Sequence, residues 1–111
     1  MKKQIELVQK FHKKFKAPIW NTPCNIPKQR YDLRYMIMNE EVKEYLKWAE
    51  NSDKKNVAKE LCDILYAVYG SIIEHWLQEH IEECFNRVHK SNMSKDYWEW
   101  KMIKWKWYFP A

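Results

Sequence analysis

The sequence predicts an all-α fold, a bundle of about four helices that forms one domain over residues 1–111. Three observations support this prediction. One Gly and four Pro leave few turn-forming positions, so long helices with few connections are expected. Apolar residues recur at the spacing of amphipathic helices, and alternating runs of β-branched residues are absent. A chain of this size can hold one core, which a second subunit could complete.

The first expected helix covers Lys2–Phe15. Its apolar face is formed by Ile5, Val8, Phe11, His12 and Phe15. We interpret His12 as a packing residue at the edge of this face, with a role in a binding site as the alternative. The next segment, Lys16–Gln29, contains three prolines, which exclude a continuous helix. In this loop Ile19 and Trp20 either line a ligand pocket or attach the loop to the core.

The second and third helices are expected to form an antiparallel hairpin. The second covers Arg30–Glu50, and the third extends to Trp76. Between them lies Asn51-Ser52-Asp53, in which Ser52 or Asp53 can accept hydrogen bonds from the first free amides of the third helix. Because the turn is short, the two helices should lie side by side.

The last part of the chain is expected to hold a fourth helix over Glu79–Lys90. Small polar residues then end the helix, in the segment Ser91–Lys95. The aromatic residues of the following segment, Tyr97–Phe109, alternate with charged residues, which favours an extended C-terminal tail. The sequence thus predicts three long helices, a shorter fourth helix and an aromatic tail.

Acidic residues stand where the hairpin should have core residues. On the second helix they share a face with Leu33, Ile37 and Trp48, and on the third they interrupt an apolar run. The set comprises Glu40, Glu41, Glu44, Glu60 and Asp63. Carboxylates three residues apart lie on one helix face, as Glu41 and Glu44 do on the second helix and Glu60 and Asp63 on the third. Both pairs stand about ten residues from the turn. Several buried carboxylates repel one another and lose hydration, so a divalent cation is expected between the helices.

The ligand types favour a hard cation. Oxygen ligands without Cys or His select Mg²⁺ or Mn²⁺. A di-iron bundle would require Glu-x-x-His pairs, and the chain has none. The three cysteines show no Cys-x-x-Cys spacing, which indicates reduced thiols in a cytoplasmic protein rather than a zinc or disulfide framework.

The pattern resembles the MazG-like superfamily of all-α nucleoside triphosphate pyrophosphohydrolases. The likeness rests on Glu40-Glu41-x-x-Glu44 followed by Glu60-x-x-Asp63, and it covers most of the chain from Asp32 onward. Further matching elements are Arg34, the run Glu60–Gly70, the segment Val88–Lys95 and the closing Tyr108-Phe109-Pro110. Within the superfamily, the branch that resembles phosphoribosyl-ATP pyrophosphohydrolase and includes dUTPase-type members is the most similar.

The resemblance implies a reaction and roles for individual residues. The enzyme would hydrolyse a nucleoside triphosphate between its α and β phosphates. Glu41, Glu44, Glu60 and Asp63 would hold Mg²⁺, and Glu40 would orient or deprotonate the attacking water. Two residues after the fourth helix, Asn92 and Lys95, would contact the phosphates. The resemblance also implies a homodimer, or a tetramer built from dimers, and dUTP as the first substrate to test.

Other functions stay open at this point. A nucleic-acid-binding module would use the Trp and Lys residues of the tail and the net charge of +5, but it leaves the interior carboxylates unexplained. Phosphoribosyl-ATP is an alternative substrate, and a regulatory domain without turnover is a further alternative. The N-terminal region lacks the continuous apolar run of a signal peptide or membrane span, so no membrane partner is expected.

Overall fold

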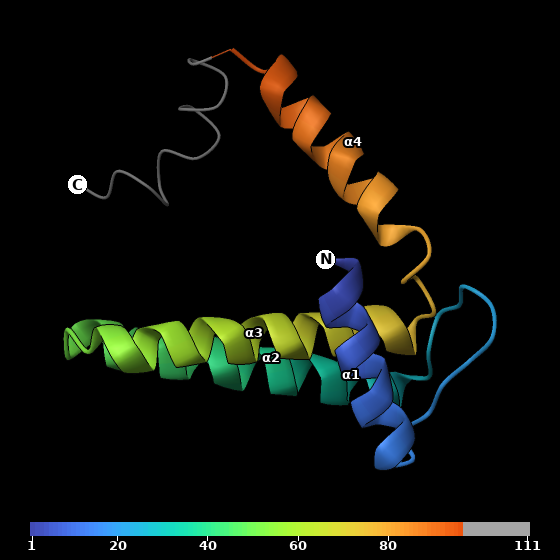
Figure 1. Cartoon of the computed structure of the whole chain (residues 1–111), viewed down its shortest axis with the longest axis horizontal. Helices are drawn as coiled ribbons and strands as arrows, with labels where there is room; N and C mark the ends of the chain where they lie inside the picture. Colours follow the sequence, from blue (N-terminus) through green and yellow to red (C-terminus); the bar gives the residue numbers. More distant parts are fainter. Residues whose placement is uncertain (97–111) are drawn as a thin grey trace. The chain divides into compact units, whose positions relative to one another are not determined.

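The computed structural model describes residues 1–96, which contain four α-helices (Figure 1). They are α1 (Lys2–Lys14), α2 (Lys28–Glu50), α3 (Lys54–Glu74) and α4 (Ile81–Ser94). The described residues contain no strand, and the all-α prediction is confirmed. The chain divides into two compact units, one formed by Met1–Glu79 and a second that begins at His80. The predicted aromatic tail, Tyr97–Phe109, lies outside the described residues.

The first unit is built on the antiparallel hairpin of α2 and α3, which lie side by side along their length (Figure 1). Between them Ser52 adopts a left-handed backbone conformation, with φ of 53°. Asp53 is the N-cap of α3, and its Oδ1 accepts a hydrogen bond of 3.1 Å from the Asn56 amide. This cap satisfies one amide of the first helical turn and fixes where α3 starts. The predicted hairpin and the cap at Asp53 are both confirmed.

Helix α1 crosses the C-terminal half of α3 (Figure 1). The buried apolar residues of the unit are Ile5, Val8, Ile26, Ala67 and Ile73. Phe11 of α1 meets Tyr66 of α3 edge to face, with ring centroids 5.5 Å apart. These contacts place one face of α1 against the part of α3 that follows the acidic residues.

The loop between α1 and α2 is attached to the end of α3. The Cys24 amide donates to the His75 carbonyl oxygen at 3.0 Å, and His75 Nδ1 lies 2.9 Å from the Cys24 carbonyl oxygen. Ile26 of this loop is buried, whereas Trp20 is 43% exposed. The loop is therefore anchored through Cys24 and Ile26.

The end of α4 differs from the sequence prediction. Helix α4 runs to Ser94, four residues beyond the predicted end, because Ser91 to Ser94 continue the helix and Lys95 is the first extended residue. Helix α3 is apolar nearly all round, and Leu61 and Leu65 are 47% and 50% exposed in the single chain. Its partners in the first unit, α1 and α2, cover only part of its surface. None of the described helices is both long enough and apolar enough to cross a membrane.

Candidate metal centre

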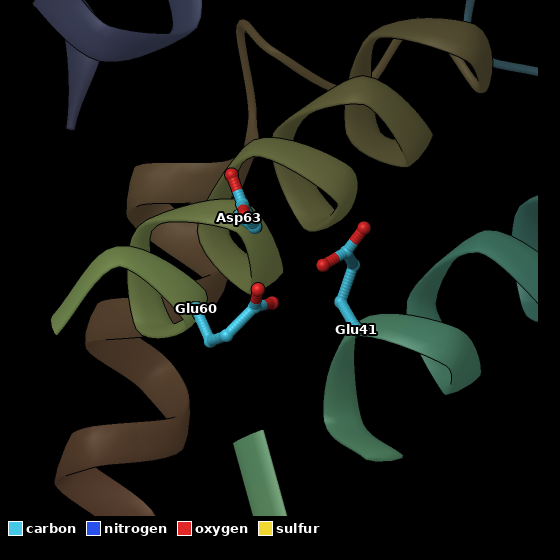
Figure 2. Close-up of side chains that lie close together, drawn as sticks. All are labelled: Glu41, Glu60 and Asp63. Atoms are coloured by element: carbon cyan, nitrogen blue, oxygen red, sulfur yellow. The ribbon is translucent and has the colours of Figure 1, made fainter. Parts of the chain in front are cut away.

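Three carboxylates converge between the two helices of the hairpin. Glu41 extends from α2, whereas Glu60 and Asp63 extend from α3, and the three side chains lie close together (Figure 2). One ligand atom from each of them lies within 4.8 Å of the others. Glu60 and Asp63 share a face because they are three residues apart on a helix. The antiparallel hairpin brings Glu41 to the same level.

The electrostatics of this group are unfavourable without a cation. Glu60 is only 5% exposed, and its Oε2 has no hydrogen-bond partner among the described residues. The pKa of Glu41 is raised to about 7, first because its protonated form shares a hydrogen bond with Glu60, and then by burial and by the charges of Glu60 and Asp63. An unsatisfied carboxylate oxygen beside a carboxyl group whose pKa is raised is what two or more anions without a counter-ion produce.

Lys59 partly compensates for this negative charge. Its Nζ lies 2.8 Å from Asp63 Oδ2 and 3.6 Å from Glu60 Oε1. The Lys59 side chain is 65% exposed, so this pairing is a surface interaction of modest energy. Glu41 and the inner oxygen of Glu60 gain no ion pair from it in the described part of the chain.

The other two acidic residues predicted for the site lie outside this group. Glu40 is exposed, because consecutive helical residues point about 100° apart and Glu41 takes the inward direction. The prediction that Glu40 and Leu33 share the inward face is therefore wrong. Glu44 is half-buried, one turn beyond Glu41, and is not among the residues that converge.

The two residues predicted to contact phosphate lie in the second unit. Asn92 is on α4, and Lys95 is its C-cap. Lys95 Nζ donates to Asn92 Oδ1 at 3.2 Å, so the structure places these two side chains together.

A cleft of about 210 Å³ opens beside the carboxylates in the first unit. Glu41 and Asp63 form one part of its wall, and residues of α1, α2 and α3 form the rest. The complete lining is Phe11, His12, Arg34, Ile37, Glu41, Asp63, Tyr66 and Ala67. A ligand in this space would meet two of the three carboxylates and an aromatic wall.

Two lining residues had a secondary place in the sequence prediction: Arg34 was an element of the family resemblance, and for His12 a role in a binding site was the alternative to packing. Arg34 is the one residue of α2 that is classed as buried, and His12 is 3% exposed. Burial lowers the pKa of His12, and the charge of Arg34 lowers it further, so this imidazole is neutral near pH 7. Arg34 stands three and seven residues before Ile37 and Glu41, a spacing that places it on the same helix face. That spacing was the available signal, but arginines on helices are usually exposed.

The donor set fits a hard divalent cation. Three carboxylates from two rigid helices offer oxygen ligands at close range, and such sites leave positions for water or phosphate oxygens. A cation there would also satisfy the unpartnered oxygen of Glu60. Among the described residues 1–96, no Cys or His joins the three carboxylates as a ligand, and zinc is therefore not favoured.

The comparisons with known proteins agree with this chemistry. The family model described as phosphoribosyl-ATP pyrophosphohydrolase matches residues 8–92, which is more than half of the chain. No curated protein and no solved structure gives a significant match. The matched range contains the three converging carboxylates and the cleft beside them. The chain therefore belongs to the phosphoribosyl-ATP pyrophosphohydrolase family, in the MazG-like superfamily of all-α nucleoside triphosphate pyrophosphohydrolases, which are hydrolases of acid anhydrides.

Proposed function

We propose that the chain is a Mg²⁺-dependent enzyme that cleaves a nucleoside triphosphate between its α and β phosphates. The products would be a nucleoside monophosphate and pyrophosphate, with Mn²⁺ as a substitute metal. The observation that carries this proposal is the convergence of Glu41, Glu60 and Asp63 within 4.8 Å, in a family that is typically dependent on a divalent metal. Glu44, one turn beyond Glu41, would add a fourth carboxylate.

Each side chain would have a defined task in this reaction. Glu41, Glu60 and Asp63 would hold the cation, which when bound neutralises charge on the phosphate oxygens. Glu40, the exposed neighbour of Glu41 in the sequence, would accept a proton from water as the water oxygen attacks phosphorus and the bond between the α and β phosphates breaks. Asn92 and Lys95, already in contact with each other, would bind phosphate oxygens.

The active form would be a homodimer, or a tetramer built from dimers. The first unit carries large apolar side chains that are about half exposed on the hairpin, and a large exposed apolar surface is typical of a protein interface. The most exposed of them are Tyr31, Tyr35, Met36, Val42, Leu46, Leu61 and Leu65. Sedimentation of a stable monomer at micromolar concentration would contradict this part of the proposal.

Two substrates are supported by different observations. The pattern of acidic residues resembles dUTPase-type enzymes, so dUTP is the first candidate. The matching family model is that of phosphoribosyl-ATP pyrophosphohydrolase, which makes phosphoribosyl-ATP at least as good a candidate. Both substrates would be cleaved at the same type of bond by the same carboxylates.

The test is pyrophosphate release from a panel of nucleoside triphosphates and phosphoribosyl-ATP, with Mg²⁺ and with a chelator. Glu41→Gln should reduce the rate about 100-fold or more, because it removes a group that acts on the transition state through the metal. Glu50→Gln, at an exposed position of the same helix, is the matched control and should retain full activity. Full turnover by Glu41→Gln would refute the assignment of the metal site, and release from none of the substrates would favour a regulatory domain.

A further inference from the structure

Arg34 carries a buried charge that no carboxylate neutralises directly. The residue is 9% exposed, and its guanidinium stays protonated at any ordinary pH. Its Nε donates to Ser71 Oγ at 3.0 Å, and its Nη2 donates to the Ala67 carbonyl oxygen at 2.8 Å. Both acceptors are neutral, and Nη1 has no hydrogen-bond partner among the described residues. A buried cation in this state gains strongly from an anionic partner.

The nearby buried carboxylate does not supply that partner. Both oxygens of Glu74 accept hydrogen bonds from Arg30, at 2.6 Å and 3.0 Å. Arg30 and Glu74 thus form a closed two-pronged pair, and Arg34 forms no ion pair within the described residues. The two arginines stand one helical turn apart on α2 but have different environments: Arg30 forms an ion pair with Glu74, whereas Arg34 feels the charge of Glu74 only at longer range.

The chain provides a specific seat for the Arg34 side chain. Gly70, the one glycine of the protein, lies under the guanidinium, and a Cβ added there would overlap Nη2 and crowd His12 Nε2. Only glycine therefore lets the guanidinium lie this close to α3. Ser71 and the Ala67 carbonyl group orient the side chain from either side of this glycine. An arginine that only covered the helix surface would need none of these contacts.

The seated guanidinium lines the same cleft as Glu41 and Asp63. A ligand there meets a positively charged donor on one side and two metal-binding carboxylates on the other. A phosphate group satisfies both, since its oxygens can bind a divalent cation and accept hydrogen bonds from a guanidinium.

We propose that Arg34, seated on Gly70 in the cleft beside the three carboxylates, binds a phosphate group of the nucleotide through its free Nη1. The inference rests on the proposed function for the identity of the ligand. It adds Arg34 to the residues that are proposed to bind phosphate. The phosphate could belong to the pyrophosphate or to the monophosphate part of the substrate, and separate ligands distinguish the two.

The experiment measures ligand affinity by isothermal titration calorimetry on the full chain with Mg²⁺. The ligands are inorganic pyrophosphate, dUMP and uncharged deoxyuridine. Arg34→Lys keeps the charge but loses the second nitrogen of the fork, and Gly70→Ala displaces the guanidinium without altering it. Both variants should weaken the binding of either pyrophosphate or dUMP about 10- to 100-fold, which is the effect of losing a charged hydrogen bond. Binding of Mg²⁺ alone should stay within about twofold of the wild type.

Lys28→Gln is the matched control, because it removes one positive charge from an exposed position of the same helix. It should leave all affinities unchanged. Circular dichroism establishes that each variant is folded, and Gly70→Ala serves if Arg34→Lys does not fold. Unchanged affinities for both pyrophosphate and dUMP in a folded variant would overturn the proposal, as would a change confined to deoxyuridine or a wild type that binds neither anion. A wild type without turnover whose pyrophosphate affinity still depends on Arg34 would refute the proposed function and leave this inference standing.

Discussion

Replacing Glu41 with Gln should stabilise the metal-free protein at high pH. In the folded chain the pKa of Glu41 is raised from 4.5 to about 7. At a pH between these two pKa values, the folded state keeps a proton on Glu41 that the unfolded state has released. The free energy of unfolding therefore falls as the pH rises through this window, and the full cost is present above pH 7. Below pH 4.5 both states are protonated, and the cost is absent.

The magnitude follows from the same shift. A pKa raised from 4.5 to about 7 corresponds to at most about 3 kcal/mol. Glu41 is only partly buried, and solvent screening reduces this limit to about 1 kcal/mol. For a domain of this size, about 1 kcal/mol changes the melting temperature by roughly 4 °C.

The assay is thermal unfolding with a chelator at pH 5 and pH 8. The Gln variant should melt roughly 4 °C above the wild type at pH 8 and close to it at pH 5. The buried neutral His12 adds a pH dependence of opposite sign, which cancels in the comparison of the two proteins. Glu50→Gln is the control, and its free energy of unfolding should differ from that of the wild type by less than about 0.5 kcal/mol at both pH values.

Adding Mg²⁺ should reverse the order, because a ligand that binds only the folded state stabilises the protein that retains its ligands. Parallel melting curves for wild type and Glu41→Gln across this pH range would refute the reasoning. So would an equal response of both proteins to Mg²⁺.

Two further substitutions test the surroundings of the site and the hairpin. Lys59→Gln removes the cation that pairs with Asp63, so Mg²⁺ should bind about two- to fivefold more tightly, as expected for the loss of an exposed competing charge. Calorimetric titration measures this, and weaker binding would show that Lys59 supports the metal ligands. Asp53→Ala removes the cap of α3 and should lower the free energy of unfolding by about 1 kcal/mol in urea denaturation. Asp53→Asn keeps an accepting oxygen, so its free energy of unfolding should fall much less. An equal decrease in both variants would exclude the cap as the cause.

The hairpin could be predicted from the sequence because its signals are local. The short turn with Asp53 at the start of α3 and the spacing of Glu60 and Asp63 each depend on a few adjacent residues. The choice between Glu40 and Glu41 was harder, because neighbouring acids differ only by the rotation of the helix. Spacing alone left both on the inward face.

Arg34 and the end of α4 could not be predicted for different reasons. Arg34 lies over Gly70, 36 residues later, and the spacing that places Arg34 on the face of Ile37 and Glu41 does not reveal this long-range contact. The extension of α4 through Ser94 was missed because small polar residues are typical of helix ends but can also continue a helix. Long-range contacts, and not helix propensity, decide both the cleft and its charge.

The loop between α1 and α2, which Cys24 attaches to His75 at the end of α3, has a consequence for the order of folding. The contacts between α2 and α3 join residues separated by a short turn, whereas α1 reaches α3 only after a much longer loop has closed. Local contacts form faster, so the hairpin should fold first and α1 should dock last. Pulse-labelled hydrogen exchange would then protect amides of α2 and α3 before those of α1, and simultaneous protection would contradict this order. In this order the cleft wall formed by Phe11 and His12 would be the final part of the first unit to assemble, onto a hairpin that already presents its carboxylates.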